Sequence, residues 1–289
     1  MFSSDLSIEL FLILKQIFTD LNGNSKMFSL REKRNTQDDP LDEFIASEVA
    51  KMSNKIECIK SPGPLISPDF VFYRNSECKK IPLEQLKNSP SKIIAIEVKK
   101  LERSKTGKIA RETGLDYNTT PPCGTVRFFD EDNNPVDVKG FYLFICLESK
   151  NDKFFVSALT LCDGDVLNED FSLYLRITGK REKQLHLGTY SDGIDRMRPM
   201  LIFSNPLGVP FLDHKFTLIT KHNLSDTDQR INLLGKILRS FDSTKTNLFH
   251  VFGTENSTNE IVELKDPFPI PKNRVVETQS RGKFRINFS

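Results

Sequence analysis

The feature that most constrains the fold is an apolar run, Ile93-Ile94-Ala95-Ile96, that continues through Glu97 to Val98. A strand buried on both faces has such a run, whereas a half-buried strand alternates apolar and polar residues. A strand of this kind needs structure packed on each side of its sheet. The run therefore predicts a central strand in a mixed α/β domain.

Segments with helical or strand periodicity surround this run. Residues 5–20 repeat apolar side chains at helical spacing, and a second helix is predicted over residues 41–52, after Asp38-Asp39-Pro40. Ser225-Asp226-Thr227-Asp228 resembles a capping box and predicts a third helix with four apolar residues on one face: Ile231, Leu234, Leu238 and Phe241. Further strands are expected at residues 70–73, 140–147, 154–161, 171–177, 200–203 and 216–220.

No internal repeat or long linker divides the 289 residues. We therefore expect one mixed α/β domain over residues 1–289, with a C-terminal extension from about Pro267 that is rich in Pro, Lys and Arg.

Charge and cysteine content exclude several classes of protein. The net charge of +2 is too small for a protein that coats nucleic acid along its whole surface, so any nucleic-acid contact must come from local basic clusters. The five cysteines are odd in number and lack CxxC spacing, which argues against a zinc site or a disulfide framework and favours a reducing, cytoplasmic location. No apolar run approaches the roughly 20 residues of a membrane span.

Four residues form a pattern with chemical meaning. Asp69 precedes the strand at residues 70–73, and Glu97 and Lys99 lie two apart on the next strong strand, so they share one face. If the two strands pair, Asp69 approaches Glu97, and two carboxylates suit Mg²⁺, which keeps several waters. Glu48 lies within the apolar stripe of the second helix, where a carboxylate needs a partner or a function. Glu43 is the second choice on that helix.

Pro68-Asp69 followed by Glu97-Val98-Lys99 resembles the PD-(D/E)XK motif of type II restriction endonucleases and related nucleases. The resemblance implies a restriction-endonuclease-like mixed β-sheet flanked by helices, with a catalytic core over about residues 41–150. It also implies that Asp69 and Glu97 hold Mg²⁺, that Lys99 assists the attacking water and that Glu48 is an auxiliary carboxylate. Residues 114–127 also look like a loop from restriction enzymes.

Basic and polar residues follow the motif and are candidate DNA contacts. A basic stretch suited to phosphates contains Arg103, Lys105, Lys108 and Arg111, and a Pro-containing loop suited to base edges contains Asn118, Thr119, Thr120 and Arg127. Solvated loops and a plain turn are the alternative interpretations of these two segments. Each half of the motif, taken alone, is likewise typical of a turn or a solvated ion pair.

The pattern as a whole predicts a Mg²⁺-dependent, site-specific endodeoxyribonuclease of the type II restriction class. Such an enzyme would act on double-stranded DNA as a homodimer, because a two-fold symmetric protein matches a palindromic site. Two alternatives stay open: a PD-(D/E)XK nuclease of DNA repair or junction resolution, and a sequence-specific DNA-binding protein that does not cut.

Overall fold

The computed structural model describes residues 5–35, 39–61, 68–74, 89–103, 106–107, 115–116, 124–129, 135–169, 200–201, 209–242, 245–255 and 261–265. Its helices are α1 (Leu6–Phe18) and α2 (Pro40–Met52). Its strands are β1 (Ile56–Lys60), β2 (Phe70–Arg74), β3 (Ile93–Glu102), β4 (Leu115–Asp116), β5 (Thr125–Phe129), β6 (Pro135–Lys150), β7 (Lys153–Asp163), β8 (Met200–Leu201), β9 (Phe216–Thr220), β10 (Asn232–Asp242), β11 (Lys245–Gly253) and β12 (Val262–Lys265).

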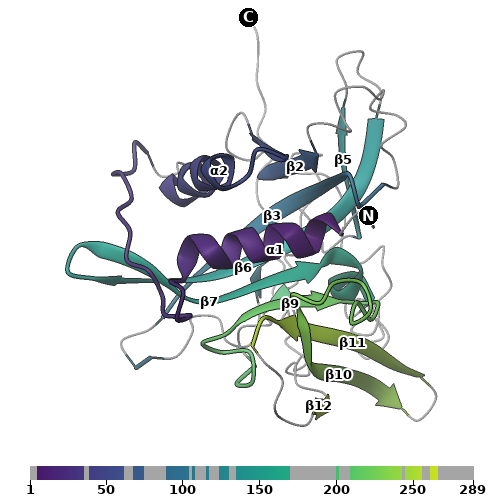
Figure 1. Cartoon of the computed structure of the whole chain (residues 1–289). Coiled ribbons are helices and arrows are strands. Elements are labelled where there is room, and N and C mark those ends of the chain that lie inside the picture. The colour runs from purple at the N-terminus through teal and green to yellow at the C-terminus, as the bar shows by residue number, and fades with distance from the viewer. Residues whose placement is uncertain are drawn as a thin grey trace, which may run out of the picture.

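A large mixed sheet dominates the described part of the chain (Figure 1). It has ten strands, with the order β1-β2-β3-β6-β7-β9-β11-β10-β12 and with β5 paired to β6 as a branch. The pairs β3–β6, β7–β9 and β10–β12 are parallel, and the other pairs in the sheet are antiparallel. The fold is therefore mixed α/β, with one sheet that joins early and late parts of the sequence.

An aspartate side chain caps the N-terminus of each helix. The Asp5 carboxylate accepts a hydrogen bond from the Ser7 N–H at 2.8 Å at the start of α1. Asp39 does the same for the Leu41 N–H at 3.1 Å at the start of α2, where Pro40 occupies the first helical position. These contacts satisfy amide groups that a helix leaves unpaired at its N-terminus. The Asp-Pro signal that predicted the start of the second helix is thus explained.

Both helices pack on one face of the sheet. α1 contacts β3, β7 and β9, and α2 contacts β1 (Figure 1). The core between helices and sheet contains Ile94 and Ile96 of β3 together with alternate residues of β6, such as Phe141 and Leu143. The even-numbered residues of β3 near its centre therefore point toward the helices, and Glu97 and Lys99 lie on the opposite face.

A second core covers that opposite face. It contains alternate residues of β6, such as Tyr142 and Phe144, and side chains from the short helical segment at 164–169 and the turn at 209–214. Burial on both faces explains why residues 93–96 of β3 and 141–147 of β6 are continuously apolar.

Most of the expected elements are confirmed. The predicted helices at residues 5–20 and 41–52 are α1 and α2, and the expected strands at 70–73, 93–98, 140–147, 154–161 and 216–220 are β2, β3, β6, β7 and β9. β8 covers the first two residues of the strand expected at 200–203. The strands β1, β4, β5, β11 and β12 were not anticipated.

The helix expected after the Ser225 capping box is wrong. The segment turns at residues 225–227 and then forms β10, which pairs with β11 and β12. Gly235 favours this outcome, because it lies opposite Val262 and a Cβ there would meet the Val262 carbonyl oxygen at 2.9 Å. Glycine is a poor helix former, and here its lack of a side chain lets β12 approach β10 closely.

Two expected features lie outside the described residues: the strand at 171–177 and the C-terminal extension from Pro267. In the part of the chain that is described, no helix combines the length and the apolar character needed to cross a bilayer.

Candidate functional site

Strand pairing brings Asp69 next to Glu97. β2 and β3 are antiparallel, with Phe70 opposite Ile96, and the same register one residue further places Asp69 opposite Glu97. The Asp69 side chain is fixed there, because its Oδ2 accepts a hydrogen bond from the Val98 N–H at 2.7 Å. Its backbone carbonyl accepts from the Ser61 N–H at 2.8 Å, which continues the β1–β2 ladder. Strand pairing thus holds Asp69, just before β2, beside Glu97 in the middle of β3.

Glu97 and Lys99 form a close pair on one face of β3. Lys99 Nζ donates to Glu97 Oε1 at 3.1 Å, and the two side chains are only 18% and 9% exposed, in that order. A largely buried carboxylate beside a lysine is the geometry expected from the alternation of β3. The ammonium group offsets part of the repulsion between Glu97 and Asp69.

The local electrostatics favour bound positive charge. Burial and the negative charge of Glu97 together raise the pKa of Asp69 to about 7, against the lowering effects of the Val98 N–H and Lys99. The carboxyl group is therefore partly protonated near neutral pH when no cation is bound. A cation that replaced this proton would relieve the repulsion.

Asp42 of α2 is a helix carboxylate on which the charge of Asp69 acts. Burial, followed by the charges of Asp69 and Asp39, raises the pKa of Asp42 to about 7. Asp39 Oδ2 also accepts from Lys100 Nζ at 3.0 Å, which ties the N-terminus of α2 to β3. Asp42 was missed in the sequence, although its place in the first turn of a helix beside the strand ends was the available signal.

Glu48, the expected auxiliary carboxylate, forms an ion pair with Lys51 on its own helix. It accepts from Lys51 Nζ at 2.6 Å, and Glu43, the second choice, pairs with Arg31 at 2.5 Å. The buried stripe of α2 consists of Leu41, Ile45 and Val49, and Met52 is 38% exposed. The stripe is therefore narrower than the sequence pattern suggested, and position 48 lies at its margin.

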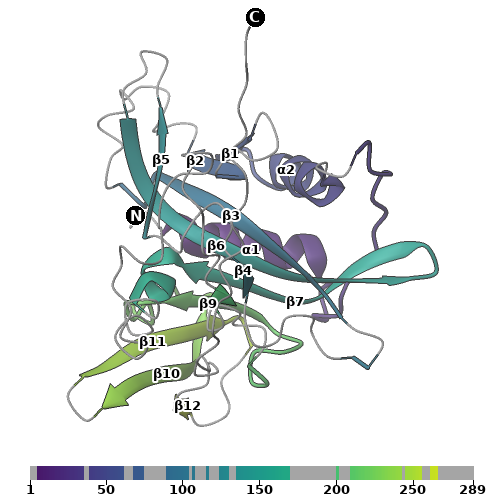
Figure 2. The ribbon, with the colours of Figure 1, turned by 180° about the vertical axis from the view of Figure 1, so that it is seen from behind.

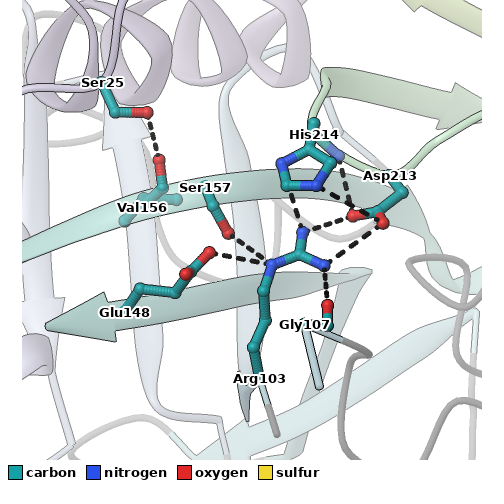
Figure 3. A network of polar contacts seen from close by, with 8 residues as sticks. All are labelled: Ser25, Arg103, Gly107, Glu148, Val156, Ser157, Asp213 and His214. Atoms are coloured by element: carbon teal, nitrogen blue, oxygen red, sulfur yellow. Dashed lines mark hydrogen bonds and ion pairs between the residues drawn. The ribbon is translucent and has the colours of Figure 1, made fainter. Parts of the chain in front are cut away.

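Arg103 lies within a network of polar contacts (Figure 3). Its side chain is 7% exposed, and it donates to Glu148 Oε1 from Nε at 2.8 Å and to both carboxylate oxygens of Asp213. It also donates to the Gly107 carbonyl at 2.9 Å and contacts the ring of His214 at 3.4 Å. The guanidinium donors of Arg103 are thus directed at groups of the chain itself, which fits an internal brace better than the expected DNA contact.

The other expected DNA contacts are only partly described. Arg127 makes two hydrogen bonds to Asp137 across the β5–β6 pair, from Nε at 2.7 Å and from Nη2 at 2.9 Å, and its side chain is 60% exposed. The remaining six residues lie outside the described ranges: Lys105, Lys108, Arg111, Asn118, Thr119 and Thr120.

The site offers few metal ligands of its own. Among the described residues, no three His, Cys, Asp or Glu side chains converge closely enough to hold a metal ion. Asp69 and Glu97 are two carboxylates, and this number fits Mg²⁺, because Mg²⁺ retains several waters and uses one or two protein carboxylates. Zinc, which takes four protein ligands in structural sites and three in catalytic ones, fits this donor set poorly.

Comparisons with known proteins returned no match: no protein-family model and no curated protein matches the sequence, and no solved structure matches the fold.

Proposed function

We propose that this chain is a Mg²⁺-dependent endonuclease of the PD-(D/E)XK type that hydrolyses phosphodiester bonds in double-stranded DNA, with type II restriction as its role. The observation that carries the proposal is the apposition of Asp69 and Glu97 on paired strands, with Lys99 donating to Glu97. In this proposal α2, β1, β2, β3 and β6 form the restriction-endonuclease-like core, and two chains act together on a palindromic site.

Each residue at the site has a distinct task. Asp69 and Glu97 would hold Mg²⁺, which when bound neutralises phosphate charge and lowers the pKa of a water. The Val98 N–H keeps the Asp69 carboxylate in place through its 2.7 Å hydrogen bond. Lys99 carries N–H donors to the same point, where they can hold a phosphate oxygen or the attacking water. Asp42 would support the site from the helix side, because the charge of Asp69 acts on its carboxyl group.

The test is incubation of purified protein with phage DNA in Mg²⁺, with Ca²⁺ and EDTA as controls. Discrete fragments in Mg²⁺ alone would support restriction, because Ca²⁺ has a looser shell and is expected to permit binding with little cutting. Nicks selective for branched or damaged DNA would indicate repair or junction resolution instead. Sequence-specific binding without cutting in Mg²⁺ would contradict an enzymatic role and leave a DNA-binding protein.

Two substitutions on α2 separate the candidate auxiliary residues. We expect Asp42→Asn to lower the cleavage rate at saturating DNA by roughly 10–100-fold, the usual cost of losing a group that supports a metal site. Glu48→Gln should stay within about threefold of wild type, because Glu48 pairs with Lys51. Single-turnover cleavage measures both. The reverse ranking would restore Glu48 to the site.

A further inference from the structure

The hairpin formed by β6 and β7 extends beyond the body of the sheet. We name residues 147–156 the β6–β7 arm; it projects past the neighbouring elements in two opposite views (Figures 1 and 2). Its last ladder pair is Lys150 with Lys153, and Asn151 and Asp152 have φ angles of 51° and 59°. Two central residues with positive φ define a tight hairpin turn whose twist matches its strands. The tip therefore has a defined shape.

The β7 strand of the arm is held by other parts of the chain, from next to the tip to the end of the arm. Phe28 and Phe154 exchange two backbone hydrogen bonds of 2.8 Å, and Ser25 Oγ donates to the Val156 carbonyl at 2.7 Å. Arg103, which directly follows β3, reaches both strands of the arm region through Glu148 and Ser157 (Figure 3). The direction of the arm is therefore coupled to the strand that carries Glu97 and Lys99.

The tip brings two positive charges together. Lys150 and Lys153 are exposed and directly opposite, and like charges in that position destabilise a hairpin. Neither ammonium group forms an ion pair with another described residue. An anion bound between or beside them would remove the repulsion. Asp152 lies in the turn between them, so residues 150–153 carry a net charge of +1, and the two ammonium groups are the part of the tip suited to a phosphate contact.

The strand register gives the distance from the candidate site. β3 is parallel to β6, with Lys99 opposite Phe144, so Lys150 lies six residues further along the same direction. At about 3.3 Å per residue this is roughly 20 Å. One turn of duplex DNA spans about 34–36 Å, so the tip can reach phosphates about half a turn from the bond at the site.

We propose that the β6–β7 arm is a second DNA-contacting surface, in which Lys150 and Lys153 bind backbone phosphates that flank the cleaved bond. The proposal rests on the proposed function and adds a substrate contact that lies outside the motif. Phosphate contacts of this kind position a duplex without reading its sequence. The arm would hold the DNA in register over Asp69 and Glu97.

The experiment measures the salt dependence of DNA binding for Lys150→Gln/Lys153→Gln. Binding to a labelled 40-base-pair duplex in Ca²⁺ is followed by fluorescence anisotropy from 50 to 200 mM KCl. Each lost phosphate contact should reduce the slope of log K against log salt by about 0.9, so the double variant should lose about two units. We expect at least about tenfold weaker binding at 100 mM KCl.

Lys265→Gln is the matched control, because Lys265 is exposed on β12 at the far edge of the sheet. It should change neither slope nor affinity, and all variants should keep the wild-type Tm. An unchanged slope in the double variant overturns the arm contact while leaving cleavage intact. If the wild-type protein binds the duplex but does not cleave it, the proposed function is overturned. The arm contact still stands in that case if the salt slope of the double variant falls. Wild-type protein that does not bind the duplex overturns both.

Discussion

Asp69→Asn is expected to abolish DNA cleavage and to stabilise the fold at pH 8 in the absence of divalent cations. The cleavage rate should fall at least about 1,000-fold, equivalent to about 4 kcal/mol of activation free energy, because a metal ligand is lost. Glu97→Gln should show the same loss of cleavage. Asn keeps an oxygen that can accept from the Val98 N–H, so the local structure is retained.

The gain in stability follows from the raised pKa of Asp69, which is about 7 in the folded protein against an ordinary value of 3.8. A group whose folded pKa is raised binds its proton more tightly in the folded state, so its contribution to stability is lost as pH rises from 3.8 through 7. The benefit of Asn is therefore greatest above pH 7 and absent near pH 4. Allowing for solvent screening, we expect about 1–2 kcal/mol at pH 8, or several degrees in Tm.

Thermal unfolding at pH 4, 6 and 8, with and without Mg²⁺, measures this prediction. Mg²⁺ should raise the Tm of wild type and leave Asp69→Asn unchanged, because only the wild type gains a bound ion. Asp228→Asn is the control with the opposite sign: the pKa of Asp228 is lowered by its hydrogen bond to Arg230, so Asn there should lower stability at pH 8 and leave cleavage intact. Cleavage by Asp69→Asn within tenfold of wild type would reject Asp69 as a ligand.

Arg103→Ala is expected to destabilise the fold by about 3 kcal/mol. Removing one partner of a buried ion pair typically costs 3–5 kcal/mol, and the lower end applies because Asp213 and Glu148 are 30% and 26% exposed. Arg103→Lys should recover part of the loss, since an ammonium group cannot make the two parallel contacts to Asp213. Urea unfolding gives the free energies.

Arg230→Ala provides the comparison, because that arginine is 56% exposed in its pair with Asp228 and should cost less than about 1 kcal/mol. The Arg103 experiment also distinguishes the DNA contact predicted from the sequence from the internal brace seen in the structure. If Arg103→Ala unfolds like wild type while the salt slope of DNA binding falls by about one unit, the guanidinium group contacts phosphate after all.

Local patterns were enough for the centre of the candidate site. The alternation of side chains along β3 placed Glu97 and Lys99 on one face. The strands β2 and β3 paired, and their register places Asp69 beside Glu97. The helix residue was not predictable in the same way. The choice between Glu48 and Asp42 depends on how α2 is rotated against β1 and β2, and that rotation is set by packing rather than by the sequence of the helix.

Contacts between distant parts of the chain account for the other differences between the sequence-based predictions and the structure. β10 contains apolar residues at both helical and strand spacing, and its partners β11 and β12 decide the outcome. Arg103 lies in a basic stretch that resembles a phosphate-binding loop, yet its main partner Asp213 is 110 residues away in the chain. A single sequence does not reveal such a partner.

The wide span of these contacts has a consequence for how the protein folds during synthesis. β1, β2 and β3 are close in sequence, so Asp69, Glu97 and Lys99 can meet early. The parallel pairing of β7 with β9 and the contact of Arg103 with Asp213 both need residues beyond 209. Contacts of large sequence separation form slowly, because the intervening chain must lose entropy first. The ribosome therefore releases Asp69 and Glu97 well before the residues beyond 209 that pair with β7 and contact Arg103. We expect the formation of this second half of the sheet to set the folding rate.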